Sequence, residues 1–149
     1  MPETVKFDLL NQSGEPISSE DFAGKKYVMF FYPKAMTPGC TTESCDFRDS
    51  YSEFADAGYE VIGVSPDPPS RNQKFKEKEG LNFDLLSDED HELAESLGAW
   101  GEKMLYGKLA EGLIRSTFVI DEHGQVERTY RNVRAKDHVA RVKADLLGV

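Results

Sequence analysis

The chain has 149 residues, 39% of them hydrophobic, which is enough to bury a core in one domain spanning residues 1–149. Its 18 Lys and Arg against 27 Asp and Glu give a net charge of −9, so we expect no nucleic-acid partner, because phosphate binding needs a basic face. No apolar run is long enough to cross a bilayer, and the acidic N-terminus lacks the apolar core of a secretory signal. We therefore expect no membrane partner and a cytoplasmic location, where a cysteine pair is more often catalytic than structural.

The start of the chain predicts two strands separated by a short helix. Residues 5–9 alternate in polarity and indicate a strand, and residues 18–21 resemble a capping box for a brief helix that ends at Gly24. The continuous apolar run from Tyr27 to Tyr32 is typical of a strand buried on both faces, as in a parallel sheet, and Pro33 ends it.

From about Thr37 to Ala57 the apolar spacing changes to that of a helix, with Gly58 as its stop. Four positions at i, i+4, i+7 and i+8 form the expected core-facing stripe of this helix: Phe47, Tyr51, Phe54 and Ala55.

Strands and helices then alternate to the end of the chain. Strands are predicted at 61–64, 83–86, 115–120 and 126–130, and helices at 67–80, 88–97 and 136–147. Residues 98–114 show no clean period. This order predicts an α/β fold in which helices flank a central mixed β-sheet.

Cys40 and Cys45 are the only two cysteines in the chain. Thr37 suits the N-cap of the predicted helix and Pro38 its first position, which places Cys40 in the first turn. Backbone N–H groups without partners in that turn stabilise negative charge, so Cys40 is expected to populate the reactive thiolate.

Helical geometry gives the two sulfurs different surroundings. At about 100° per residue, Cys40 points within roughly 20° of Phe47, toward the core, while Cys45 points to the outer face near solvent. Their Cα atoms would lie roughly 8 to 9 Å apart, whereas a disulfide needs about 4.4 to 6.8 Å. A Cys40–Cys45 disulfide therefore requires unwinding of residues 38–48.

The cysteines also allow two interpretations without redox chemistry. Buried cysteines are often inert small apolar residues, although a strand-to-helix junction is an unusual place for one. A zinc site normally needs four ligands, and the three histidines fall on separate predicted elements.

Pro33, Thr37 and Cys40 match the Pro-x-x-x-Thr-x-x-Cys motif of the peroxiredoxins. With Glu43 and Cys45 added, the region resembles the bacterioferritin-comigratory (peroxiredoxin Q) subfamily. Further matches to this subfamily lie at residues 31–34, 100–103, 106–108 and 115–121.

The resemblance implies a thioredoxin-like fold and reduction of hydrogen peroxide and alkyl hydroperoxides without a metal, haem or other cofactor. Cys40 would be the peroxidatic cysteine that becomes a sulfenic acid, and Cys45 the resolving cysteine that forms an intramolecular disulfide with it. Thioredoxin or a similar dithiol reductant would then restore both thiols.

The remaining motif residues have roles implied by the same resemblance. Thr37 supplies a hydroxyl to the peroxide, Arg115 stabilises the thiolate and polarises the departing oxygen, and Pro33 shields the sulfur from water. Glu43 orients an arginine, either Arg115 or Arg48.

Each assignment has a simpler alternative. In these alternatives, Thr37 would be only an N-cap, Pro33 would only end a strand, and Arg115 would be only a surface charge at the start of a strand. Glu43 would only complement the positive end of the helix dipole. For Trp100 and Tyr106, loop packing and substrate contact are equal alternatives.

The chain departs from its relatives at Ala35-Met36, which replaces a polar pair before the motif threonine and leaves the preferred peroxide open, and it lacks the usual Pro-Asp-Phe opening. A thioredoxin-like protein disulfide oxidoreductase is the alternative function, but such enzymes use Cys-x-x-Cys, whereas four residues separate the cysteines here. A non-catalytic acidic binding module is a third possibility. Because both cysteines lie in one helix, a monomer is expected, with a dimer as the alternative.

Overall fold

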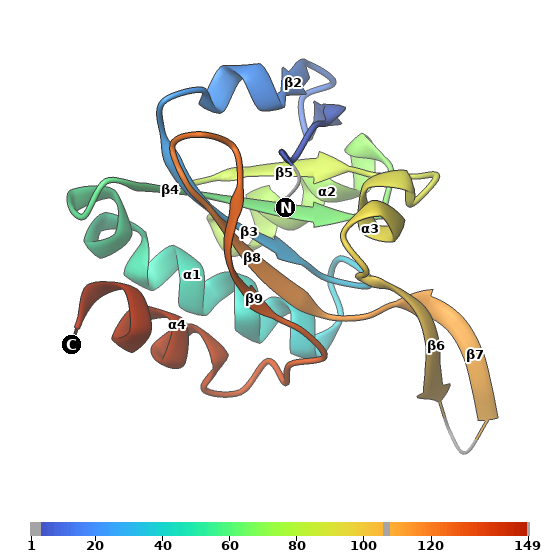
Figure 1. Ribbon diagram of the computed structural model, residues 1–149. Helices are drawn as coiled ribbons and strands as arrows, with labels where there is room; N and C mark the ends of the chain where they lie inside the picture. Colours follow the sequence, from blue (N-terminus) through green and yellow to red (C-terminus); the bar gives the residue numbers. More distant parts are fainter. Residues whose placement is uncertain (1–3, 106–107, 149) are drawn as a thin grey trace.

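The computed structural model describes residues 4–105 and 108–148 and arranges them in a central sheet with helices on both faces (Figure 1). The strands are β1 (Asp8–Asn11), β2 (Pro16–Ser18), β3 (Lys26–Phe31), β4 (Tyr59–Ser65), β5 (Asp84–Ser87), β6 (Trp100–Leu105), β7 (Lys108–Leu113), β8 (Ser116–Ile120) and β9 (Val126–Tyr130). The helices are the 3-10 helix η1 (Ser19–Phe22) and the α-helices α1 (Pro38–Asp56), α2 (Pro69–Glu79), α3 (Glu92–Ser96) and α4 (His138–Leu147). Within the described residues, no helix combines the length and the apolar character that a membrane span requires.

Seven strands form the sheet in the order β2-β1-β5-β4-β3-β8-β9, and β6 and β7 form a separate hairpin that projects from the body (Figure 1). Strands β3, β4 and β5 run parallel, while β8 is antiparallel to β3 and β9 to β8. The predicted mixed sheet with flanking helices is therefore confirmed.

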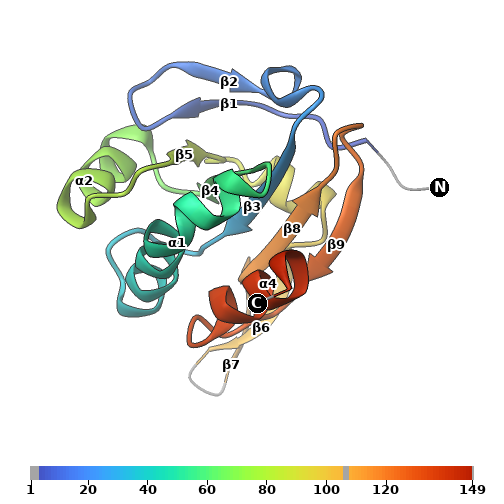
Figure 2. The same cartoon turned by 90° about the vertical axis from the view of Figure 1, so that its left-hand side faces the viewer.

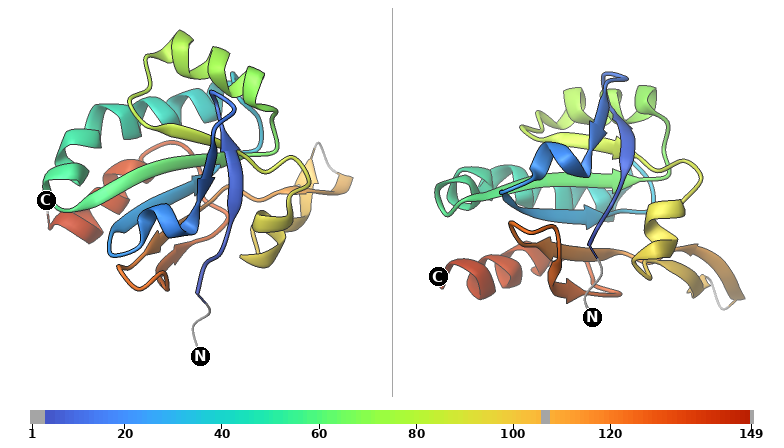
Figure 3. Two further views of the ribbon diagram at one scale, coloured as in Figure 1. Left: turned by 90° about the horizontal axis from the view of Figure 1, so that it is seen from above. Right: turned by 45° about the horizontal axis from the view of Figure 1, so that its top comes forward.

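Strand β3 is the centre of the core because both of its faces are covered. Val28 and Phe30 face the cluster formed with α1, α2 and α4, and Met29 and Phe31 face a second cluster that includes α3 and the N-terminal segment. Figures 2 and 3 show the helices of these two clusters on opposite sides of the sheet, with α1, α2 and α4 on one side and α3 on the other. The unbroken apolar run of β3 is thus explained by burial on both faces.

Helix α1 confirms the predicted helix, but its core-facing stripe is narrower than expected. Phe47 and Phe54 are fully buried and Tyr51 is half-buried, whereas Ala55 is exposed, so the prediction for Ala55 was wrong. Ala55 projects about 80° away from Phe47 around the helix axis, which places it beyond the surface that the sheet covers.

The remaining differences from the predictions are local. The first strand begins at Asp8 rather than at residue 5, and β2 and the β6–β7 hairpin were not predicted. Helix α3 is shorter than the predicted 88–97, because the Asp88 carboxylate accepts hydrogen bonds from the backbone N–H groups of Leu93 (3.2 Å) and Ala94 (2.9 Å) and so caps a later start.

Three segments meet at one edge of the sheet. The last residue of β3, Phe31, lies opposite Val64 near the end of β4, and also opposite Ser116 at the start of β8. The loops that lead into α1 and α2 therefore lie beside the residue that precedes β8, which is Arg115.

Candidate functional site

Cys40 lies in the first turn of α1, as predicted, and its side chain is fully buried (0% exposed) in the core cluster that contains Phe47. Pro38 is the first residue of the helix. The backbone N–H groups of this turn carry the positive end of the helix dipole. The position itself thus favours an anionic sulfur.

Thr37 occupies the N-cap position, but its side chain makes no capping hydrogen bond. Its hydroxyl donates instead to the carbonyl oxygen of Lys34, at 2.8 Å. The interpretation of Thr37 as an N-cap is therefore right for the backbone and wrong for the side chain, because the hydroxyl fixes the loop that precedes the helix. Its oxygen retains lone pairs that can accept a further hydrogen bond.

Arg115 joins Cys40 to Glu43. Its Nη2 lies 3.3 Å from Cys40 Sγ, and its Nη1 donates to Glu43 Oε1 at 2.8 Å. Burial lowers the pKa of the Arg115 guanidinium, but Glu43 and Cys40 more than offset this, so the net shift is upward and the cation is retained. The pairing of β3 with β8 brings this charge to a cysteine 75 residues away in sequence.

Gly39 allows the guanidinium to approach this closely. A Cβ atom at this position would lie 3.1 Å from Arg115 Nη2 and 3.8 Å from Cζ. Since Arg115 is held by both Glu43 and Cys40, a larger residue would crowd a side chain that has little freedom to move.

Glu43 is completely buried (0% exposed) and, of the two arginines that the sequence offered as partners, it is paired with Arg115. Its Oε1 is paired with Arg115, while Oε2 has no hydrogen-bond partner among the described residues. Burial raises the pKa of Glu43 to about 7, although Arg115 opposes the shift. Burial thus favours the protonated carboxyl of Glu43, whereas Arg115 favours the carboxylate.

His138, on α4, completes this buried cluster and was not singled out from the sequence. Its Nε2 lies 2.7 Å from Thr117 Oγ1 and 3.9 Å from Glu43 Oε2, and the residue is 4% exposed. Burial, Arg115 and Arg141 lower the pKa of His138 to about 4, so the imidazole is neutral at pH 7. The sequence offered only a histidine at the start of the last helix, with no sign of its partners.

Asp67 and Arg71 hold the loop between β3 and α1 and were also missed. The Asp67 carboxylate accepts from the backbone N–H of Ala35 at 2.7 Å, and Arg71 Nη2 donates to the Ala35 carbonyl at 3.2 Å. The two side chains are themselves ion-paired at 3.2 Å. The next residue, Met36, has a left-handed backbone (φ 64°), a conformation that a non-glycine residue rarely adopts without such support.

Cys45 lies away from Cys40, on the side of α1 that faces the end of α2. It is half-buried rather than free in solvent, and its Sγ donates to Glu79 Oε1 at 3.6 Å. Burial raises the pKa of the Cys45 thiol, Arg48 opposes this and Glu79 adds to it. Both cysteines are free, and α1 runs unbroken through them.

The other residues considered from the sequence lie apart from the sulfur or make no polar contact with it. Pro33 is half-buried, two residues beyond β3. Trp100 stacks on His91, with ring centroids 3.7 Å apart and planes 4° apart, which supports packing rather than substrate contact. Tyr106 lies outside the described residues.

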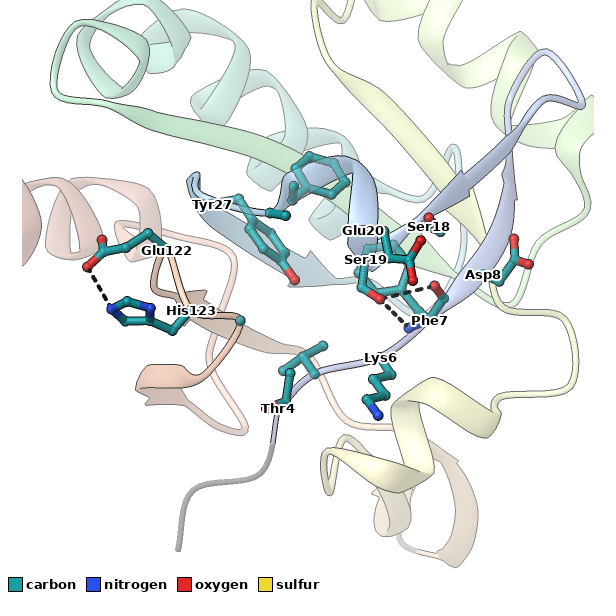
Figure 4. Close-up of a pocket in the computed structure, with 14 residues that line it drawn as sticks. Thr4, Lys6, Phe7, Asp8, Ser18, Ser19, Glu20, Tyr27, Glu122 and His123 are labelled. Carbon is teal, nitrogen blue, oxygen red and sulfur yellow. Dashed lines mark hydrogen bonds and ion pairs between the residues drawn. The ribbon is translucent and has the colours of Figure 1, made fainter.

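A pocket of about 720 Å³ lies between the N-terminal segment, η1 and the turn that joins β8 to β9 (Figure 4). Phe7, Phe22 and Tyr27 form its apolar wall, with Lys6 and His123 at its polar side. Neither cysteine lines it, so this pocket is separate from the site around Cys40.

Comparison with known proteins gives consistent matches over most of the chain. A model of the AhpC/TSA family matches residues 2–129. Peroxiredoxin Bcp of Escherichia coli K12 is 46% identical over 133 residues, and Peroxiredoxin Bcp of Bacillus subtilis strain 168 is 50% identical over 133 residues; each match covers 89% of this chain and 85% of the relative. The solved structure of the bacterioferritin comigratory protein of Xanthomonas campestris has a TM-score of 0.89 at 37% identity and covers 95% of this chain and 90% of that chain. The predicted thioredoxin-like fold is thus confirmed.

Proposed function

The chain belongs to the AhpC/TSA family and, within it, to the Bcp/peroxiredoxin Q subfamily, so it is a thiol peroxidase that reduces hydroperoxides, and we propose that Cys40 is its peroxidatic cysteine. One observation carries this assignment. Cys40 lies in the first turn of α1 with its sulfur 3.3 Å from the Arg115 guanidinium, and both features stabilise a thiolate. Burial and Glu79 raise the pKa of the Cys45 thiol, although Arg48 opposes the shift, and Cys45 Sγ donates a hydrogen bond to the Glu79 carboxylate.

In the first step, the Cys40 thiolate attacks the peroxide oxygen that carries hydrogen. The S–O bond forms as the O–O bond breaks, and the sulfur loses two electrons and becomes a sulfenic acid. The second oxygen leaves with the electron pair and takes up a proton, giving an alcohol or water. Arg115 stabilises charge on the departing oxygen, and the Thr37 hydroxyl accepts a hydrogen bond from the peroxide.

Glu43 and Pro33 act through other residues. Glu43 fixes the guanidinium by the 2.8 Å hydrogen bond to Nη1, so that Nη2 points at the sulfur. Pro33 closes the loop before α1 against water. Since Cys40 is 0% exposed, a peroxide reaches Sγ only when side chains at this loop move aside.

In the second step, the Cys45 thiol condenses with the Cys40 sulfenic acid. The disulfide forms, the sulfenic oxygen leaves as water, and the proton of Cys45 is consumed in that water. Because both residues lie in the continuous helix α1, their separation of roughly 8 to 9 Å must first be closed by unwinding. Thioredoxin or a similar dithiol protein then reduces the disulfide by exchange.

We further propose that the whole chain, residues 1–149, acts as one cytoplasmic domain, and that its substrates include alkyl hydroperoxides as well as hydrogen peroxide. The X. campestris relative has been studied for its alkyl peroxide reduction activity. The half-buried Met36 lies four residues before Cys40 and packs against the core cluster that contains it, so this loop offers apolar surface that suits an alkyl group.

Rapid mixing of the reduced protein with one equivalent of hydrogen peroxide tests these roles. Quenching with an alkylating agent followed by mass spectrometry counts thiol, sulfenic acid and disulfide over time. Fast oxidation is expected in the unmodified protein and none in Cys40→Ser. In Cys45→Ser the first oxidation should persist and stop at the sulfenic acid. Unchanged catalytic turnover of Cys45→Ser with a dithiol protein reductant would overturn the role of Cys45 as resolving cysteine.

A further inference from the structure

Three contacts tie the segment of α1 around Cys45 to the end of α2. Cys45 Sγ donates to Glu79 Oε1 (3.6 Å), Arg48 Nη1 donates to the Glu79 carbonyl oxygen (2.5 Å), and Asn82 Nδ2 donates to the Arg48 carbonyl (3.3 Å). We call Arg48, Glu79 and Asn82 the Cys45 restraint. None of these three residues contacts Cys40 or Arg115 by a hydrogen bond or an ion pair within the described part of the chain.

We propose that Glu79, assisted by Arg48, is a positioning residue that holds Cys45 away from Cys40 and thereby sets how fast the disulfide forms. The inference rests on the proposed function, in which Cys45 resolves the Cys40 sulfenic acid. It goes beyond that function because it assigns the control of the second step to residues outside the peroxide-binding site.

The geometry supports a restraint rather than a proton acceptor that works during the attack. Cys45 can reach Cys40 only after the first turns of α1 unwind, and that movement separates Cys45 from Glu79. Glu79 ends helix α2, whose next residue, Gly80, has the left-handed conformation of a helix C-cap. The carboxylate therefore remains on α2 when Cys45 leaves, and its contact with the thiol stabilises only the helical state.

Arg48 makes a second contact between this segment of α1 and Glu79. Its guanidinium bonds a carbonyl at the C-terminal end of α2, where the helix dipole favours a cation. The charged groups that face Cys45 are Arg48 and Asp49 on its own helix and Glu79 on α2. Glu79 and Arg48 thus both hold Cys45 beside the end of α2. Their effects on the pKa of the Cys45 thiol are opposite, because Glu79 raises it and Arg48 lowers it.

Because Glu79 and Arg48 have opposite effects on the pKa of Cys45, substituting each of them distinguishes a restraint on the position of Cys45 from an effect on its acidity. Glu79→Gln removes a charge that raises the pKa of Cys45, and Arg48→Met removes one that lowers it. In a Cys40→Ser background, the pH midpoint of Cys45 alkylation should therefore shift down with Glu79→Gln and up with Arg48→Met. Both substitutions should nevertheless accelerate disulfide formation in the full enzyme, since both release the restraint.

The experiment follows the two steps separately after rapid mixing with hydrogen peroxide. Sulfenic acid formation should keep its rate in Glu79→Gln. Conversion of sulfenic acid to disulfide should become about two- to fivefold faster, because a neutral amide oxygen accepts a weaker hydrogen bond from Cys45 than a carboxylate does. The peroxide concentration that half-inactivates the enzyme by overoxidation should rise by a similar factor. Glu77→Gln is the matched control, because it removes the same charge from an exposed position of the same helix and should change neither step.

Slower disulfide formation in Glu79→Gln would overturn the proposal and indicate that the carboxylate serves as a base. Unchanged formation in both Glu79→Gln and Arg48→Met would also overturn it. If no variant forms a sulfenic acid at Cys40, the proposed function fails instead, and the alkylation midpoints in Cys40→Ser still report whether Glu79 contacts Cys45.

Discussion

Arg115 is the residue on which the first chemical step depends most, because one guanidinium serves both Cys40 (3.3 Å) and Glu43 (2.8 Å). Replacing it with Met should slow the oxidation of Cys40 by hydrogen peroxide about 100-fold, a loss comparable to removing one hydrogen bond that stabilises transition-state charge. Stopped-flow measurement of sulfenic acid formation in Cys45→Ser checks this rate without interference from disulfide formation.

Arg115→Lys supplies the control for charge alone. Lysine keeps one positive charge but loses the planar arrangement that bonds two partners at once, so its rate should fall between those of the unmodified protein and Arg115→Met. Equal rates in all three proteins would show that Arg115 has no part in the reaction.

At the scale of elements, α1, β8 and α4 meet at a buried contact of Glu43, Thr117 and His138. Two of these residues, Glu43 and His138, make the stability of the fold depend on pH in opposite directions. Glu43 has a folded-state pKa of about 7, above its unfolded value, so its contribution to stability is full at acidic pH and is lost as the pH rises toward 7. His138 has a folded-state pKa of about 4, below its unfolded value, so its contribution is full above about pH 6.5 and is lost as the pH falls toward 4.

The two effects offset each other in the unmodified protein between about pH 4.5 and 6.5. In Glu43→Gln only His138 contributes to this pH dependence. The free energy of unfolding of Glu43→Gln, relative to that of the unmodified protein, should therefore rise by roughly 1 kcal/mol per pH unit in this window. In His138→Gln the same difference in free energy of unfolding should fall with pH by a similar amount. Urea denaturation at a series of pH values measures both, and parallel curves for all three proteins would contradict the assigned ionisations.

The elements and residues that the sequence predicted correctly are those encoded locally. Cys40 in the first turn of α1 follows from Thr37 and Pro38 immediately before it, and β3 follows from its unbroken apolar run. His138 and Asp67 were missed because their roles depend on contacts between distant segments: His138 reaches Thr117, 21 residues away, and Asp67 reaches Ala35, 32 residues away.

Ala55 and the β6–β7 hairpin show two further limits. The exposure of Ala55 depends on how far the sheet extends beneath α1, and a helical period alone does not contain that information. The hairpin pairs Gly101 with Gly112 and Trp100 with Leu113, so it has little alternation of polarity to reveal it.

At the scale of the whole molecule, the redox cycle requires one segment to unfold while the sheet remains intact. Amide exchange should increase in residues 38–48 of the oxidised, Cys40–Cys45 bonded protein, because the disulfide cannot form across intact helical turns. It should remain unchanged in β4 and β8, which are buried and paired on both edges. Hydrogen exchange with mass spectrometry locates the change, and equal exchange in both redox states would rule out the coupling.

We propose that the protein is a monomer, and the surface of the described residues supports this. Among the described residues the only exposed large hydrophobic side chain is Leu10, at 45%, so that part of the surface lacks the apolar area that a stable dimer normally buries. The net charge of −9 adds repulsion between copies at low salt. Because both cysteines lie on one helix, the chemistry needs no residue from a second chain. Sedimentation velocity of the reduced and the oxidised protein should give a single species near 16.8 kDa in each case, and a dimer that persists on dilution would contradict this proposal.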